Sequence, residues 1–270
     1  MLAKRVLVSI ITMAVWAGAI FFLPAWWFCM FCGLFIILGL VEFFDLARSK
    51  GIFVHKYWVI ILGILFSMSY YFQQTLGVEF WELELIAIGI IGLFLFQFAR
   101  QNGESAIVNI SVSLFGLLYI AWFFSFFIKL RYLDNGGLWI SFVVLVCKLG
   151  DVGAYFIGKR FGRHKLIQRI SPNKSIEGSL GGFLTSVLVA YSARLFLPAV
   201  SFIHLLILGV LLGILGQLGD LAESLLKRDS QVKDSGRIIP GFGGVLDLID
   251  SLLFTTPVLY FYLTVIMKVQ

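Results

Sequence analysis

Four carboxylates lie in the two apolar segments that flank one short polar stretch. Asp220 and Glu223 close the first apolar run, and Asp247 and Asp250 lie in the second. Each pair is spaced i, i+3, so its members would share one face of a helix. Carboxylates within hydrophobic segments are costly and mark functional sites. Two antiparallel helices could present all four to one another as oxygen ligands for Mg²⁺, which commonly bridges carboxylates to substrate phosphates.

The polar stretch itself is basic and rich in glycine. Its basic side chains could neutralise phosphate oxygens, the arginines in bidentate fashion: Lys227, Arg228, Lys233 and Arg237. Its glycines would let backbone N–H groups approach a ligand: Gly236, Gly241, Gly243 and Gly244. The alternative is a salt-bridged loop between two helix ends, which would leave Asp247 and Asp250 unexplained. The combination therefore predicts divalent metal and phosphate chemistry at a membrane surface.

Two further polar islands precede this one. Lys148 and Asp151 are spaced i, i+3, and Asp151 is read either as a ligand-binding residue or as half of a buried neutral pair. Lys174, Ser175 and Glu177 stand where a helix is expected to begin. A helix N-terminus with Lys and Ser beside it suits phosphate, whereas an ordinary helix cap is the alternative.

Long apolar segments must position these islands. Of the 270 residues, 60% are hydrophobic and 13% charged, which predicts an all-α, polytopic integral membrane protein. About nine transmembrane helices are expected, at residues 4–22, 25–46, 56–74, 81–100, 105–129, 136–158, 178–198, 202–226 and 244–267. Residues 1–100 are interpreted as a scaffold, where Glu42 and Asp45 near Arg48 suggest an interfacial ion pair. Residues 101–270 are interpreted as the catalytic region.

The distribution of basic residues predicts the orientation. With the N-terminus in the cytoplasm, 16 of the 21 Lys and Arg residues fall on the cytoplasmic side. All three islands then face the cytoplasm from the cell (inner) membrane. The net charge of +6 reflects this topology, and no pattern typical of nucleic-acid binding is present.

The third island resembles the signature of the CDP-diacylglycerol synthases, also called phosphatidate cytidylyltransferases. That signature runs Ser-x-apolar-Lys-Arg, four residues, Lys-Asp, a Gly/Pro turn, His-Gly-Gly and Asp-Arg-x-Asp. The matching positions are Ser224, Leu226, Lys227, Arg228, Lys233, Asp234, Gly236, Ile239, Pro240, Gly243, Gly244, Asp247 and Asp250. Phe242 and Leu248 depart from the family's His and Arg. Residues 151–158 and 171–178 also resemble family segments.

The resemblance implies transfer of CMP from CTP to phosphatidic acid, with release of pyrophosphate. The attacking phosphate is already ionised, which agrees with His55, His164 and His204 lying in no carboxylate cluster of the sequence. Asp220, Lys227, Arg228 and Asp247 are the predicted catalytic residues. Mg²⁺ is predicted on Asp220, Glu223, Asp247 and Asp250, with room for a second cation. The predicted substrate contacts are Asp151, Lys174, Ser175, Glu177, Ser224, Lys233, Asp234, Arg237, Gly243 and Gly244.

Two alternatives concern the class of function. A CTP-dependent lipid-alcohol kinase would release CDP instead of pyrophosphate. An ion-coupled transporter would spread its charges across the membrane depth and often contain inverted repeats, whereas these acids cluster at one end of the C-terminal helices. A homodimer is expected from the resemblance.

Overall fold

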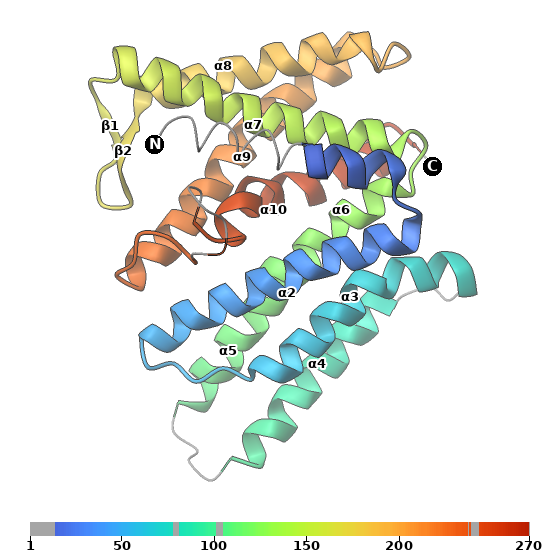
Figure 1. Cartoon of the computed structure of the whole chain (residues 1–270), viewed down its shortest axis with the longest axis vertical. Helices are drawn as coiled ribbons and strands as arrows, with labels where there is room; N and C mark the ends of the chain where they lie inside the picture. Colours follow the sequence, from blue (N-terminus) through green and yellow to red (C-terminus); the bar gives the residue numbers. More distant parts are fainter. Residues whose placement is uncertain (1–13, 78–80, 101–104, 237, 239–242, 270) are drawn as a thin grey trace. The chain divides into compact units, whose positions relative to one another are not determined.

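The computed structural model describes residues 14–77, 81–100, 105–236, 238 and 243–269, which are mainly helical (Figure 1). They form two compact units, and each is described by itself. The first comprises Met1–Lys129 with Asp234–Leu248, and the second Leu130–Lys233 with Ile249–Gln270. The second half of the signature loop thus packs with the N-terminal helices. A division of roles at residue 100 remains a prediction.

The first unit is a bundle with an aromatic core. Its helices are residues 14–22, α2 (Ala25–Ser49), α3 (Lys56–Leu76), α4 (Trp81–Phe98), α5 (Ala106–Gly116), a π-helical segment (Leu117–Trp122) and most of α6 (Phe123–Arg131). Helix α3 contacts both α2 and α4. Phe28, Phe44, Phe66, Phe124 and Phe127 are fully buried. Burial of such large side chains stabilises the bundle.

The second unit contains three mutually contacting helices and a short hairpin. Its elements are α7 (Gly136–Phe161), β1 (Lys165–Ile167), β2 (Ser171–Ser175), α8 (Ile176–Ser192), a 3-10 turn (Ala193–Leu195), α9 (Phe202–Asp229), most of α10 (Leu246–Phe261) and a π-helical turn (Tyr262–Ile266). Helices α7, α8 and α9 contact one another. Strands β1 and β2 pair antiparallel and extend beyond the adjoining ends of α7 and α8 (Figure 1).

The predicted class of fold is confirmed in its coarse form. Seven helices within the described ranges are long and apolar enough to cross a membrane: 25–49, 56–76, 106–131, 136–161, 176–195, 202–229 and 246–266. Helix α4 coincides with the predicted span 81–100 but is not among the seven. The first predicted span, 4–22, begins outside the described residues. The count of nine and the cytoplasmic N-terminus remain predictions. The hairpin was not predicted, because its polar sequence lacks apolar alternation.

Glycines allow α7 and α8 to approach closely. A Cβ added at Gly178 would lie 3.0 Å from the Ala154 carbonyl oxygen and from Gly158 Cα. Backbone atoms cannot move aside as a side-chain end can. Gly178→Leu should therefore destabilise the protein by about 2–3 kcal/mol, because it overpacks this interface. Thermal unfolding in detergent measures the loss. Ser192→Leu, at an exposed position of the same helix, is the control, and equal melting temperatures would contradict the expectation.

Candidate active site

A cluster of charged side chains gathers in the second unit. We call it the charged cluster, and it consists of Lys148, Asp151, Lys174, Asp220 and Asp250. Lys174 forms an ion pair with Asp220, and Lys148 Nζ lies 3.8 Å from Asp151 Oδ2. Asp250 interacts electrostatically with Asp220, Lys148 and Asp151. The structure therefore brings together residues from all three polar islands of the sequence.

The charged cluster has a buried floor and an open rim. Asp250 is only 6% exposed, whereas the side chain of Asp151 is 44% exposed and that of Lys174 is 30% exposed. Three carboxylates face two ammonium groups, which leaves a formal excess of negative charge. Like charges held this close disfavour one another, so a bound cation would be stabilised here.

Close packing of α9 against α10 positions Asp220 and Asp250. A Cβ added at Gly219 would meet the backbone carbonyl of Asp250, so only glycine permits this approach. Lys148 Nζ also donates to Ser251 Oγ at 3.3 Å, and Ser251 is fully buried. Ser251 was not predicted, since a lone Ser in an apolar run usually only satisfies its own helix backbone.

The start of α8 uses two of its predicted substrate contacts internally. Ser175 is the N-cap, and its Oγ accepts the Gly178 N–H at 3.1 Å, which is the ordinary helix cap that the sequence left open as the alternative. Glu177 accepts the backbone N–H groups of Arg163 and His164 and contacts His164 Nδ1 at 2.6 Å. His164 thus contacts one carboxylate, a contact that the sequence did not predict because residues 164 and 177 are brought together by the intervening hairpin.

Three further predicted residues, on α9, lie in other contacts. Glu223 is fully buried and forms an ion pair with Lys227, which is 8% exposed. Arg228 donates from Nε to the Ile170 carbonyl at 3.2 Å and from Nη1 to the Val232 carbonyl at 3.1 Å. Arg228 and the neighbouring Lys233 are exposed, so both can meet a ligand from solution. Ser224 Oγ lies 3.5 Å from Asp220 Oδ1.

Asp247 and the glycines of the signature belong to the first unit. Asp247 Oδ2 accepts the backbone N–H of Gly244 at 2.8 Å and that of Ser235 at 3.1 Å. Gly243 has a φ of +110°, which favours glycine, and Asp234 is exposed. Leu248 is 9% exposed, while Arg237 and Phe242 lie outside the described residues. The Gly244 N–H predicted to approach a ligand is thus already donated to Asp247.

Glu42 has a different environment from the one that the sequence predicts. It is 3% exposed and accepts hydrogen bonds from Val245 and Leu246 instead of joining an interfacial ion pair. Its only signal in the sequence was a carboxylate inside an apolar helix, the same signal that identified Asp247 and Asp250.

No group of three or more His, Cys, Asp or Glu side chains in the described ranges has an arrangement that could by itself hold a metal ion. The chemistry of the charged cluster nevertheless suits Mg²⁺, because this ion takes one or two carboxylates and completes its shell with water and substrate phosphates. Asp220 and Asp250 are the two carboxylates that would bind this Mg²⁺ ion. The fit therefore depends on a phosphate-bearing ligand.

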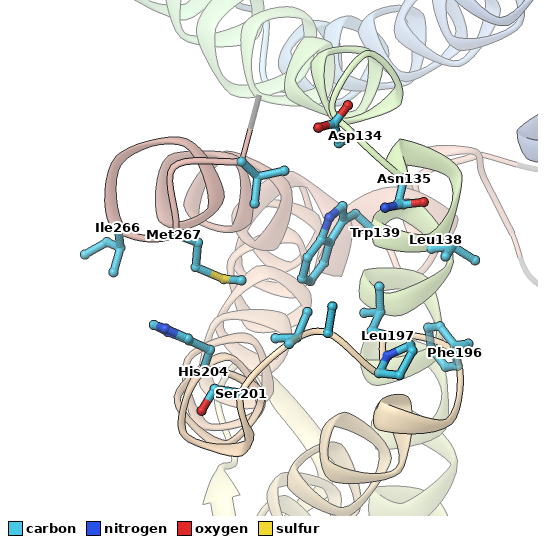
Figure 2. A pocket seen from close by; sticks show the side chains of 14 residues that line it. Asp134, Asn135, Leu138, Trp139, Phe196, Leu197, Ser201, His204, Ile266 and Met267 are labelled. Carbon is cyan, nitrogen blue, oxygen red and sulfur yellow. The ribbon is translucent and has the colours of Figure 1, made fainter.

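A cavity of about 690 Å³ lies elsewhere in the second unit (Figure 2). It is lined by the start of α7, the loop between α8 and α9, and the C-terminal segment, with Trp139, His204 and Met267 among its residues. Trp139 precedes Asp151 by twelve residues on α7, which corresponds to about 18 Å of helix. Asp134 is its one acidic residue. The cavity lacks the charges that phosphate chemistry needs, and we assign it no catalytic role.

Comparison with known proteins identifies the family. A family model described as "Cytidylyltransferase family" matches residues 3–266. The chain belongs to the cytidylyltransferase family. Membership makes it an enzyme of the nucleotidyltransferase class, and this favours the enzyme interpretation over the transporter. The apolar helices make it a multi-pass membrane protein.

Its relatives carry a more specific name. A phosphatidate cytidylyltransferase of Synechocystis sp. is 34% identical over 98% of both chains. The phosphatidate cytidylyltransferase of Bacillus subtilis is 36% identical over 84% of this chain and 86% of its own length. That of Staphylococcus epidermidis is 43% identical over 59% of this chain and 61% of its own length. The similarity extends beyond the signature loop into the N-terminal helices.

Proposed function

We propose that this cytidylyltransferase transfers the CMP group of CTP to phosphatidic acid, giving CDP-diacylglycerol and pyrophosphate. The observation that carries the proposal is the charged cluster, in which acidic and basic side chains from α7, β2, α9 and α10 meet. The names of the relatives supply the acceptor lipid.

The chemistry needs positioning and charge neutralisation rather than a strong base. A phosphate oxygen of phosphatidic acid attacks the α-phosphorus of CTP and forms the new P–O bond. The bond between that phosphorus and the β-bridging oxygen breaks, and pyrophosphate leaves with the electron pair. Because the attacking oxygen is already ionised, no group must remove its proton. Lys174 and the exposed Arg228 and Lys233 are proposed to hold phosphate oxygens during this displacement.

Asp220 and Asp250 are proposed to hold Mg²⁺, which supplies charge neutralisation for the triphosphate and the leaving pyrophosphate. Asp247 and Glu223 remain predicted further ligands, although Asp247 also accepts hydrogen bonds from its own loop. A second cation remains a prediction. We also propose that the site faces the cytoplasm from the inner membrane, where CTP and phosphatidate meet, and that the protein is a homodimer.

The test is product analysis with purified protein in detergent. Labelled CTP is supplied with phosphatidic acid and Mg²⁺, and each component is omitted in turn. Pyrophosphate release that needs both, with the label in a lipid product, is the expected result. CDP release with a lipid alcohol as acceptor would instead assign the protein to the CTP-dependent kinases. Pyrophosphate release without lipid labelling would contradict the proposed acceptor.

Lys174 is expected to contribute to binding the nucleotide phosphates. Lys174→Met keeps much of the length of the side chain but removes its charge, and it leaves Asp220 without this partner. We expect KM for CTP to rise about tenfold, because one phosphate-neutralising cation is lost. Initial rates at varied CTP measure the change. Lys165→Met is the control, since Lys165 is an exposed lysine of the same hairpin. An unchanged KM in Lys174→Met would remove Lys174 from the site.

A further inference from the structure

A buried carboxylate on α2 binds the segment that contains the second half of the signature. Glu42 Oε1 accepts the Val245 N–H at 2.9 Å, and Oε2 accepts the Leu246 N–H at 2.8 Å. The Ser235 hydroxyl lies 3.0 Å from Oε2. These partners are about two hundred residues away in the sequence. A carboxylate that is 3% exposed needs such donors, because burial without them is costly.

The start of α10 cannot provide its own cap. The first N–H groups of a helix have no partner within the helix, and a Ser, Thr, Asp or Asn side chain usually accepts them. The two residues before α10 are Gly244 and Val245. Neither has a side chain that can accept a hydrogen bond. Glu42, from a different helix, accepts the N–H of Leu246, the first residue of α10, and that of Val245 just before it, and its negative charge suits the positive end of the helix dipole.

Two glycines leave room for Glu42. A Cβ added at Gly236 or at Gly244 would collide with the Glu42 carboxylate. In the structure these two glycines therefore make room for the carboxylate of Glu42 and not for a ligand. Glycine at both positions and Glu42 form one arrangement, and changing any one of them disturbs the others.

The same arrangement reaches Asp247. The Ser235 hydroxyl lies 2.9 Å from Asp247 Oδ2 as well as 3.0 Å from Glu42 Oε2. A hydroxyl has one proton to donate, so it bonds to one carboxylate at a time and links the two positions. Asp247 also accepts the Gly244 N–H, next to the two N–H groups bound by Glu42. The location of the Asp247 carboxylate therefore depends on Glu42.

We infer that Glu42 is a positioning residue of the enzyme, which holds the start of α10 and thereby sets the place of Asp247. The inference rests on the proposed function, because it assigns catalytic importance to Asp247. It also assigns a role in the reaction to α2, in the part of the chain interpreted from sequence as scaffold.

The kinetic experiment compares Glu42→Gln with the full-length wild type. Glutamine keeps the shape but offers one acceptor oxygen and one NH₂ group, so one of the two N–H groups would face a donor. We expect kcat for CMP transfer to fall ten- to a hundredfold, as for residues that orient a ligand, with KM for CTP changed by less than about threefold. The Mg²⁺ concentration for half-maximal rate should rise. Asp45→Asn, an exposed acid one turn along α2, should stay within about twofold of wild type.

An amide-exchange experiment tests the contact without any activity. In folded Glu42→Gln, the Val245 and Leu246 amides should exchange at least about tenfold faster with deuterium, because an acceptor is lost. Unchanged exchange would overturn the inference. So would wild-type kcat in this variant, or an equal loss in Asp45→Asn.

A milder variant covers the case in which Glu42→Gln does not fold. Ser235→Ala removes only the hydroxyl between the two carboxylates and should lower kcat in the same direction, by about three- to tenfold. Unchanged kcat in Ser235→Ala would then overturn the inference. A wild-type protein that transfers no CMP would overturn the proposed function and the catalytic part of this inference, while amide exchange would still decide whether Glu42 holds the loop.

Discussion

Replacing Asp220 with Asn should lower the rate of CMP transfer about a thousandfold, the largest effect of any single substitution in the charged cluster. Asp220 pairs with Lys174 and interacts electrostatically with Asp250. Asparagine keeps the shape and one acceptor oxygen but removes the charge that a divalent cation requires. The loss should appear in kcat, with partial recovery at raised Mg²⁺, and the measurement is pyrophosphate release at saturating CTP.

Asp134→Asn is the matched control for this substitution. Asp134 is an exposed acid of the same unit and lines the cavity of Figure 2, away from the charged cluster. It should keep wild-type activity, since exposed substitutions away from a site have small effects. Full activity in folded Asp220→Asn would show that the reaction does not depend on this cluster, and the proposed site would then be wrong.

Removal of Mg²⁺ should reduce the rate of CMP transfer to the background rate. The triphosphate and the carboxylates of the charged cluster are all negative, so without a cation the substrate is repelled from Asp220 and Asp250. Treatment with EDTA followed by measurement of lipid labelling tests this expectation. Mn²⁺ should restore activity better than Ca²⁺, because Ca²⁺ prefers longer bonds and more ligands.

The control restores Mg²⁺ in excess over the chelator in the same sample. Recovery of the starting rate shows that EDTA did not unfold the protein. Labelling that persists in EDTA, with CTP and phosphatidic acid alone, would contradict a metal-dependent reaction. A rate restored equally by Ca²⁺ and by Mg²⁺ would argue against a site built from one or two carboxylates.

Predictions of local structure from the sequence succeeded where a single physical term dominates. Long apolar runs predict helices because the backbone must satisfy its hydrogen bonds inside hydrocarbon, and seven such helices are present in the described ranges. Ser175 was predictable as a cap because a Ser before an apolar run typically begins a helix. The β1–β2 hairpin was missed, because its strands are short and polar and lack the apolar alternation that predicts a strand.

The site was predictable as a set of residue types but only partly as a set of contacts. Asp151, Lys174, Asp220 and Asp250 meet in the charged cluster, as metal-binding carboxylates and phosphate-binding groups would. Glu223 and Lys227 instead pair with each other at i, i+4 on α9. The spacing allowed both outcomes, since Glu223 is three residues from Asp220 and four residues from Lys227, and both spacings place side chains on the same helix face.

The sequence by itself determined that this is a helical membrane protein with most of its basic groups in the C-terminal half and with carboxylates inside its last two apolar segments. Those features follow from hydropathy and from the cost of charge in hydrocarbon, which act on each segment separately. Only the tertiary structure decided that Asp247 is bound by its own loop and that Glu42 caps α10. The Glu42 contacts join residues about two hundred positions apart, and their geometry is set by packing that no local pattern records.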